Sequence, residues 1–295
     1  MLIYMDKCGY YHLFSDGFRA DFLFEDKSSF IFGMNMVALC FLKSRVEVIA
    51  FCLMDNHVHF ILYGTVTDCI CFKDKFLHQY GLWYSNRYEG KCCQELIFDI
   101  KLMDDERYIL TSIAYVLRNG IAAGFRFCAD DYEWSSNGLY FRDPERLSLL
   151  TSGWKKISDM TIRERRHFLK TRAEIPPEWL VTQAGFIWPG NYVNYKHAES
   201  LYRSPKSFAF FMGQRKEDEI NNVLGIHNSV CLPDIELREK AVNSCIRLFG
   251  TADLRALDVK SRIVLAKELR KDYYCSFKQI ARIVHLHSKY LAELV

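Results

Sequence analysis

The chain has 295 residues, half of them hydrophobic and 15% aromatic, which exceeds one typical domain and allows sizeable cores. With 39 Lys and Arg against 36 Asp and Glu, the formal net charge is only +3, so any DNA-binding charge must be local. No run of about 18 apolar residues is present, and a membrane-spanning helix is not expected.

The 11 cysteines include the adjacent pair Cys92 and Cys93 and no Cys-x-x-Cys spacing. Most have apolar neighbours, as Cys52 does between Phe51 and Leu53. We therefore expect reduced core thiols of a cytoplasmic protein rather than a disulfide framework or a zinc site. The first residues show no basic-then-apolar segment typical of a signal peptide.

The first half of the chain alternates strand and helix patterns. A helix is predicted over residues 28–43, and the apolar runs 46–53 and 57–62 predict two strands of a hairpin. A second helix is expected over 68–87. A third begins at the acidic residues 104–106, because anionic groups favour the positive end of the helix dipole. This order predicts an α+β fold, a ferredoxin-like antiparallel sheet with helices on one face.

The second strand of this hairpin carries His57 and His59. Side chains alternate along a strand, so both imidazoles lie on one face with Cα atoms roughly 6.5–7 Å apart. Two imidazoles placed in this way can converge on one metal ion or one phosphate. Many sheets carry two histidines without a catalytic role, so the pair needs further residues to make a site.

The third helix offers those residues. Its apolar positions recur at helical spacing, and Gly120 predicts its end. Tyr115 and Asn119 are four residues apart and share one helical face, where they could supply a nucleophile and a third metal ligand. The alternative is a half-buried tyrosine that packs beside an asparagine near a helix end. Tyr108, two turns before Tyr115, is a second candidate nucleophile, although we expect it to pack against neighbouring residues.

These features, in this order, resemble the single-tyrosine HUH transposases, in particular the bacterial REP-associated tyrosine transposases. In that family an Asn-His-x-His strand motif precedes a helix that reads Tyr-Ile-x-x-Asn-Pro-x-x-Ala-Gly. Residues 56–59 and 115–124 correspond to these motifs, with Gly120 in place of the family's proline. Further counterparts are an opening strand at 10–14, a Trp- and Tyr-containing stretch at 83–88 and an aromatic residue before Trp-Ser-Ser at 132–136.

The resemblance implies a DNA transposase that cleaves and rejoins single-stranded or hairpin DNA. Tyr115 would form a 5′-phosphotyrosine link, and His57, His59 and Asn119 would hold a divalent metal ion, Mg²⁺ or Mn²⁺. The imidazoles by themselves suit zinc, manganese or cobalt better than magnesium. Arg118 would contact DNA. The family contains both monomers and homodimers, and it acts on DNA in the bacterial cytoplasm, at the nucleoid.

The pattern changes after Asp143-Pro144. We predict a catalytic domain over 1–145, a helical middle region over 146–235 and a helical DNA-binding region over 236–295. Tyrosines and phenylalanines between residues 192 and 211, interleaved with basic residues, could form a nucleic-acid surface. A helical core with a solvated basic rim explains the same residues and is preferred.

The C-terminal end resembles a helix-turn-helix. Residues 276–284 predict a short amphipathic helix with an N-terminal serine cap, and 288–295 predict a second helix after a three-residue joint. Residues 260–293 hold eight basic side chains and three acidic ones, so the positive charge is concentrated here. We expect Lys278, Arg282 and Lys289 to contact DNA. A plain three-helix bundle is the alternative.

Two other functional classes fit the same motifs. The first is a protein that keeps the fold and binds DNA without catalysis, although the presence of all four candidate site residues favours an enzyme. The second is a metal-dependent hydrolase that uses His57 and His59 on another substrate. A hydrolase predicts a carboxylate or a third histidine near the pair and no use for Tyr115.

Overall fold

The computed structural model describes residues 7–15, 23–55, 57–88, 98–122, 132–213, 234–273, 275, 277–287 and 291. Within the first 122 residues, the elements are β1 (Gly9–Ser15), α1 (Lys27–Leu42), β2 (Glu47–Leu53), β3 (Val58–Gly64), α2 (Val66–Arg87), β4 (Phe98–Met103) and α3 (Glu106–Ala122). The order β1-α1-β2-β3-α2-β4 is that of a ferredoxin-like unit.

Four strands form one antiparallel sheet in the order β2-β3-β1-β4. The predicted α+β class, an antiparallel sheet followed by a helical C-terminal part, is confirmed. β2 and β3 are buried along almost their whole length because both of their faces are covered. β4 was not predicted, since this edge strand buries only one of its residues and has a weak apolar pattern.

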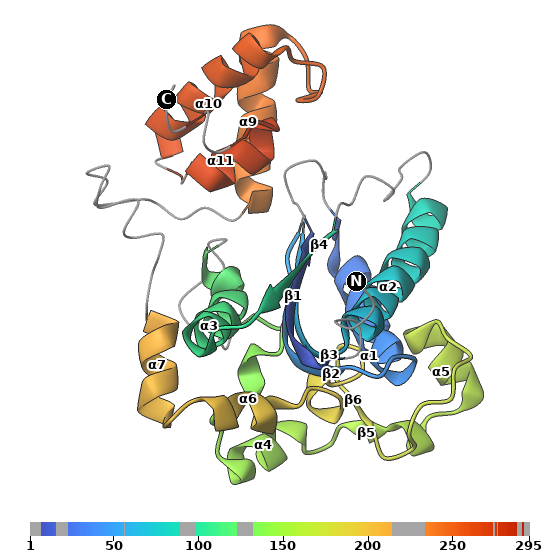
Figure 1. Cartoon of the computed structure of the whole chain (residues 1–295). Helices are drawn as coiled ribbons and strands as arrows, with labels where there is room; N and C mark the ends of the chain where they lie inside the picture. The colour runs from blue at the N-terminus through green and yellow to red at the C-terminus, as the bar shows by residue number, and fades with distance from the viewer. Residues whose placement is uncertain are drawn as a thin grey trace.

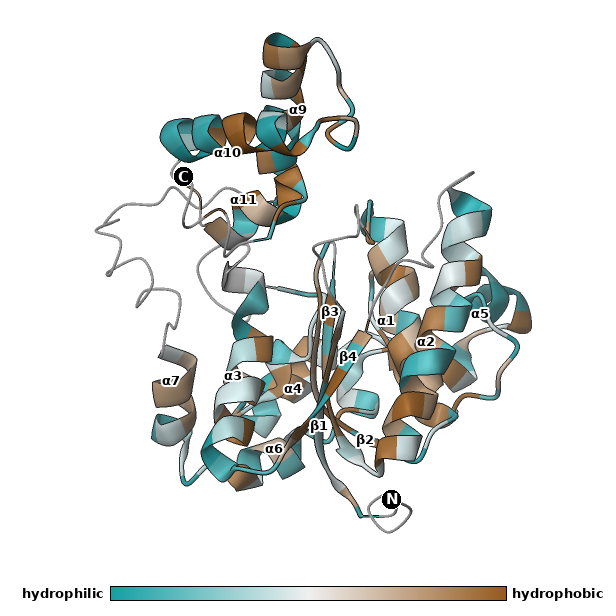
Figure 2. Ribbon diagram, turned by 45° about the horizontal axis from the view of Figure 1, so that its top comes forward, coloured by the Kyte–Doolittle hydropathy of each residue, from teal (hydrophilic) through white to brown (hydrophobic). Residues whose placement is uncertain are grey.

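Helices cover both faces of the sheet (Figure 1). α1 and α2 lie on one face, where the Phe60 ring lies 5.3 Å from the rings of both Phe72 and Phe76. α3 lies on the opposite face. Helices therefore cover two faces of the sheet, whereas the sequence predicted helices on one face. The hydropathy colouring shows the strands as mainly apolar between these two layers (Figure 2).

The middle region shares the hydrophobic core of the sheet. Its elements are α4 (Pro144–Thr151), β5 (Lys155–Lys156), α5 (Ile162–Leu169), β6 (Leu180–Val181), α6 (Tyr195–Leu201), α7 (Pro205–Gly213) and short 3-10 turns at Asn137–Leu139, Ile157–Asp159 and Pro189–Asn191. One cluster of buried residues runs from Tyr11 to Tyr202, and the Ile187 amide donates to Asn35 Oδ1 at 2.8 Å. The hydrophobic core therefore continues across the predicted domain boundary near residue 145.

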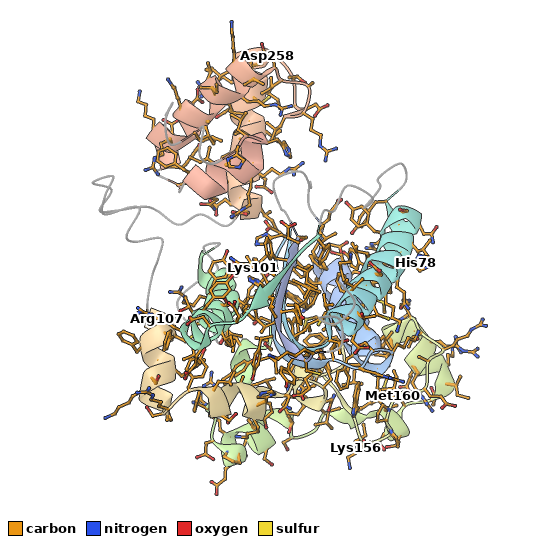
Figure 3. All side chains as sticks on the ribbon, viewed as in Figure 1. His78, Lys101, Arg107, Lys156, Met160 and Asp258 are labelled. Carbon is orange, nitrogen blue, oxygen red and sulfur yellow. The ribbon has the colours of Figure 1, made fainter. Side chains whose placement is uncertain are left out.

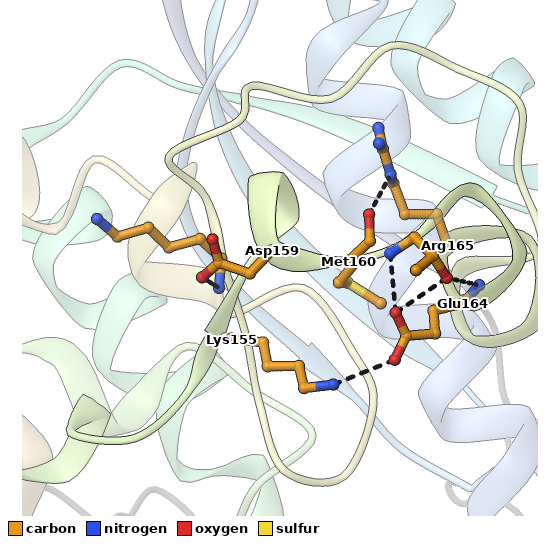
Figure 4. Close-up of polar contacts among 7 residues, drawn as sticks. Lys155, Asp159, Met160, Glu164 and Arg165 are labelled. Atoms are coloured by element: carbon orange, nitrogen blue, oxygen red, sulfur yellow. Dashed lines mark hydrogen bonds and ion pairs between the residues drawn. The ribbon is translucent and has the colours of Figure 1, made fainter.

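Local polar contacts shape the surface of this region. The side chains of Thr161 and Glu164 form a capping box at the start of α5, and Lys155 pairs with Glu164 at 3.1 Å (Figure 4). Tyr192 and Tyr202 are buried in the core, in agreement with the preferred interpretation of this region as helical packing.

The C-terminal helices α9 (Asp234–Phe249), α10 (Val259–Tyr273) and α11 (Phe277–Val284) surround a second, separate hydrophobic cluster. The second helix predicted at 288–295 lies outside the described residues except for Leu291, so the helix-turn-helix stays a prediction. In the described parts of the chain, no helix combines the length and apolar character needed to cross a bilayer.

Candidate active site

The turn that carries His57 is held by backbone hydrogen bonds. The Met54 amide donates to the His57 carbonyl at 2.8 Å, and the Val58 amide donates to Ser15 Oγ at 2.9 Å. The Asp55 carbonyl accepts from the amides of residues 23 and 24. The start of β3 is therefore rigidly joined to the end of β1 and to the residues before α1.

Tyr115 of α3 lies beside the histidine pair. The rings of His57 and His59 have centroids 4.9 Å apart and stand nearly perpendicular, at 89°. The Tyr115 ring lies 5.4 Å from the His59 ring, centroid to centroid. His57 and His59 are buried, whereas Tyr115 is partly exposed. The strand and the helix thus bring together three of the predicted site residues.

Asn119 completes this cluster from the next turn of α3. Its Nδ2 donates to the Tyr115 carbonyl at 2.9 Å, and its side chain also hydrogen-bonds His57. This bond uses one of the two Nδ2 hydrogens, and the side-chain oxygen has lone pairs that can act as a ligand. Only 6% of Asn119 is exposed, so its amide is held within the protein.

Burial keeps the two histidines neutral. It lowers the pKa of His57 to about 3, with a smaller lowering from the Arg282 charge and an opposing hydrogen bond from Asn119. Burial also holds the pKa of His59 well below its usual value. Neutral imidazoles carry the lone pairs that metal ligands require. His59 Nε2 is buried and has no hydrogen-bond partner in the described part of the chain, so the donor set suits a bound cation.

His12 is a site neighbour that the sequence motifs did not indicate. Its Nε2 lies 3.1 Å from His59 Nδ1, and it is 7% exposed. β1 pairs Phe14 with His59, which places His12 on the same face of the sheet. Strand alternation along residues 10–14 indicates which residues share a face with His12. It does not indicate that this face meets His59, which depends on the pairing of β1 with β3.

A third histidine is what the hydrolase alternative predicted. Even so, no group of three His, Cys, Asp or Glu side chains among the described residues is arranged to hold a metal ion. His12 is engaged by His59, and Tyr115 lies at the site instead of away from it. The hydrolase alternative predicted a third histidine near the pair, and His12 meets that expectation. It also predicted no role for Tyr115, and the position of Tyr115 beside His59 does not meet that expectation.

Arg282 lies at this site and not on an open C-terminal surface. Its guanidinium donates twice to Asp234 Oδ2, at 2.7 and 3.1 Å, and Asp234 is only 1% exposed. The Arg282 charge acts on His57, His59 and Tyr115. The structure places Arg282 in an ion pair with the buried Asp234 beside the candidate site residues, and its expected contact with DNA stays a prediction.

The remaining predicted residues have different surroundings. Arg118 is partly buried, and its Nη1 donates to the Met212 carbonyl of α7 at 3.5 Å. Lys289 and the side chain of Lys278 lie outside the described residues. Tyr108 packs under Lys101, whose Nζ lies 4.7 Å from the centre of its ring.

The predicted helix end at Gly120 is wrong, because α3 continues to Ala122. The glycine is explained by packing: a Cβ at residue 120 would lie 2.6 Å from Tyr132 Cγ. The family's proline also has a Cβ and would meet the same ring. Tyr132 in turn donates to the Leu53 carbonyl at 2.6 Å, next to the histidine hairpin.

We expect Gly120→Ala to destabilise the protein by about 1–3 kcal/mol, the range for overpacked cores. Three atoms of Tyr132 would lie under 3 Å from the new methyl group, which outweighs the gain in helix propensity. Thermal unfolding measures the effect. Gly138→Ala is the matched control, since nothing lies within 4 Å of its added Cβ. Equal melting temperatures for the two variants would contradict this explanation of Gly120.

No protein-family model matches the chain, and no curated protein is similar to it. Among solved structures, it is similar to the structure described as "the REP associates tyrosine transposase bound to a REP hairpin". The TM-score is 0.35 and the identity 14%, over 48% of this chain and 86% of that chain.

Proposed function

We propose that the protein is a DNA strand transferase of the single-tyrosine HUH kind, which cleaves and rejoins single-stranded or hairpin DNA through Tyr115. One observation carries this proposal: two neutral imidazoles, an amide and a phenol converge from β3 and α3. These two elements are separated along the chain by α2 and β4, so their meeting is a product of the fold.

Tyr115 is the proposed nucleophile because it supplies the phenol of the cluster and the residue is partly exposed. Its oxygen forms a bond to phosphorus while the bond from phosphorus to the 3′ oxygen breaks. Tyr115 loses its phenolic proton, and the departing 3′ oxygen gains one proton to become a hydroxyl. One phosphodiester replaces another, so a second 3′-hydroxyl can reverse the step and join strands without an external energy source. A free tyrosine has a pKa of about 10 and needs assistance at neutral pH.

His57, His59 and Asn119 are the proposed holders of a divalent metal ion, Mg²⁺ or Mn²⁺. A cation bound there would polarise the scissile phosphate and offset the charge that develops on its oxygens. We propose His59 Nε2 and the Asn119 side-chain oxygen as donor atoms of this set, because His59 Nε2 is buried and has no hydrogen-bond partner among the described residues. Arg282 adds a fixed positive charge nearby, and we propose that it helps to hold the phosphate.

The decisive experiment incubates the full chain with labelled hairpin-bearing single strands and Mn²⁺. A covalent adduct on a denaturing gel, mapped by peptide mass spectrometry to Tyr115, is the expected result. Binding without any adduct would instead support a non-catalytic DNA-binding protein. Hydrolysis products without an adduct would support the metal-dependent hydrolase.

Lys101 is a further candidate contact with the DNA backbone. It is exposed on β4, opposite His12 in the strand pairing and close to α3 (Figure 3). We expect Lys101→Ala to weaken binding to single strands uniformly across sequences. The slope of log affinity against log salt should fall by about 0.7, the value for one lost phosphate contact. Fluorescence anisotropy over a NaCl series measures both effects.

Lys156→Ala is the matched control, because this lysine is equally exposed but lies on β5, away from the site (Figure 3). An identical salt slope in the two variants would contradict a role for Lys101.

Activity of this kind would place the protein in the bacterial cytoplasm, at the nucleoid, as a monomer or a homodimer.

A further inference from the structure

We propose that His12 is a positioning residue for the candidate metal site, holding His59 in the tautomer whose Nε2 is unprotonated and open to a cation. This inference rests on the proposed function and adds to it a residue outside the histidine motif. His12 itself does not bind the cation in this scheme.

The contact between the two rings is direct and buried. His12 Nε2 and His59 Nδ1 are 3.1 Å apart, and the ring centroids are 5.2 Å apart. His12 is 7% exposed and His59 is 5% exposed. A neutral imidazole has one donor and one acceptor nitrogen, so one ring must donate to the other.

Only one direction of this hydrogen bond leaves a metal ligand. If His59 Nδ1–H donates to His12 Nε2, then His59 Nε2 keeps a lone pair. If His12 donates instead, His59 Nε2 carries a proton, and none of the described residues offers an acceptor to that buried N–H. A buried donor without an acceptor is unfavourable, whereas a lone pair at the same atom is what a cation would occupy. The first direction is therefore favoured by the protein itself.

The fold holds His12 firmly in this position. β1 lies between β3 and β4 in the sheet, and the His12 ring lies 5.0 Å from the Phe14 ring. Metal-binding histidines commonly donate their second ring nitrogen to a partner that orients them, and loss of that partner weakens metal binding about 10–100-fold. Here the partner is another imidazole on the neighbouring strand.

The test compares His12→Leu with His12→Gln in the full chain. Glutamine places an acceptor near the former Nε2 position, whereas leucine has none. Electron paramagnetic resonance of free Mn²⁺ during a titration gives the affinity without any reaction. We expect His12→Leu to bind Mn²⁺ about 10–100-fold more weakly than wild type. His12→Gln should stay within a few-fold of wild type, and His59→Ala provides the reference for loss of a ligand.

Nitrogen-15 chemical shifts of labelled histidines in the metal-free wild type give an independent answer that needs no variant to fold. Protonation of His59 at Nδ1 is expected. Protonation at Nε2 would overturn the inference, as would a folded His12→Leu variant with unchanged Mn²⁺ affinity. If wild type and His59→Ala bound Mn²⁺ equally, the metal site itself would fail, and the positioning role with it.

Discussion

Replacement of Tyr115 by phenylalanine is expected to abolish the covalent protein–DNA adduct while DNA binding persists. The substitution removes only the attacking oxygen, and the aromatic ring beside His59 remains. Strand cleavage should fall by at least about 10³-fold, because the substitution removes the proposed nucleophile. Denaturing gels measure the adduct, and anisotropy measures the binding.

Tyr108→Phe is the control for this prediction. Tyr108 lies on the same helix but packs beneath Lys101, so its loss should change adduct formation by no more than a few-fold. An adduct that survives in Tyr115→Phe and disappears in Tyr108→Phe would show that Tyr108 is the nucleophile. An adduct that survives in both would rule out tyrosine attack from α3.

Asp234→Ala is expected to give the largest loss of stability, about 3–5 kcal/mol in the C-terminal helices. The change leaves the Arg282 guanidinium without the carboxylate that now holds it at 2.7 Å. α9 and α11 are joined by this pair at the edge of their own hydrophobic cluster. Hydrogen exchange followed by mass spectrometry should show faster exchange across α9–α11, by at least about 100-fold.

Glu236→Ala supplies the comparison for Asp234. It removes an acidic residue from the same first turn of α9, but its partner Lys240 is 3.8 Å away and both side chains are at least partly exposed. Such a surface pair contributes about 0–1 kcal/mol. Similar exchange rates in the two variants would mean that the buried pair does not stabilise the C-terminal helices.

Part of this site, the histidine hairpin, could be predicted from local patterns in the sequence. β2 and β3 are continuous apolar runs joined by a short turn, and His57 and His59 are two residues apart. Alternation along a strand is local, so their shared face follows from spacing alone. The same holds for Tyr115 and Asn119 on α3, because four residues make about one helical turn.

The neighbours of His12 and Arg282 could not be predicted from the sequence. His12 reaches His59 through the antiparallel pairing of β1 with β3, which joins strands 47 residues apart at this contact. Arg282 was expected on a DNA-reading surface, and it donates to the buried Asp234 and lies close enough to the candidate site to lower the pKa of His57. Neither position has a local pattern that indicates its neighbours.

The sequence by itself determined the α+β class and the two pairs of candidate residues, because helical and strand periodicities act over a few residues. The tertiary structure decided that these pairs meet, that α3 continues past Gly120 and that His12 and Arg282 join the cluster. Those outcomes depend on strand order and on packing between distant segments, and burial then sets the protonation of the histidines.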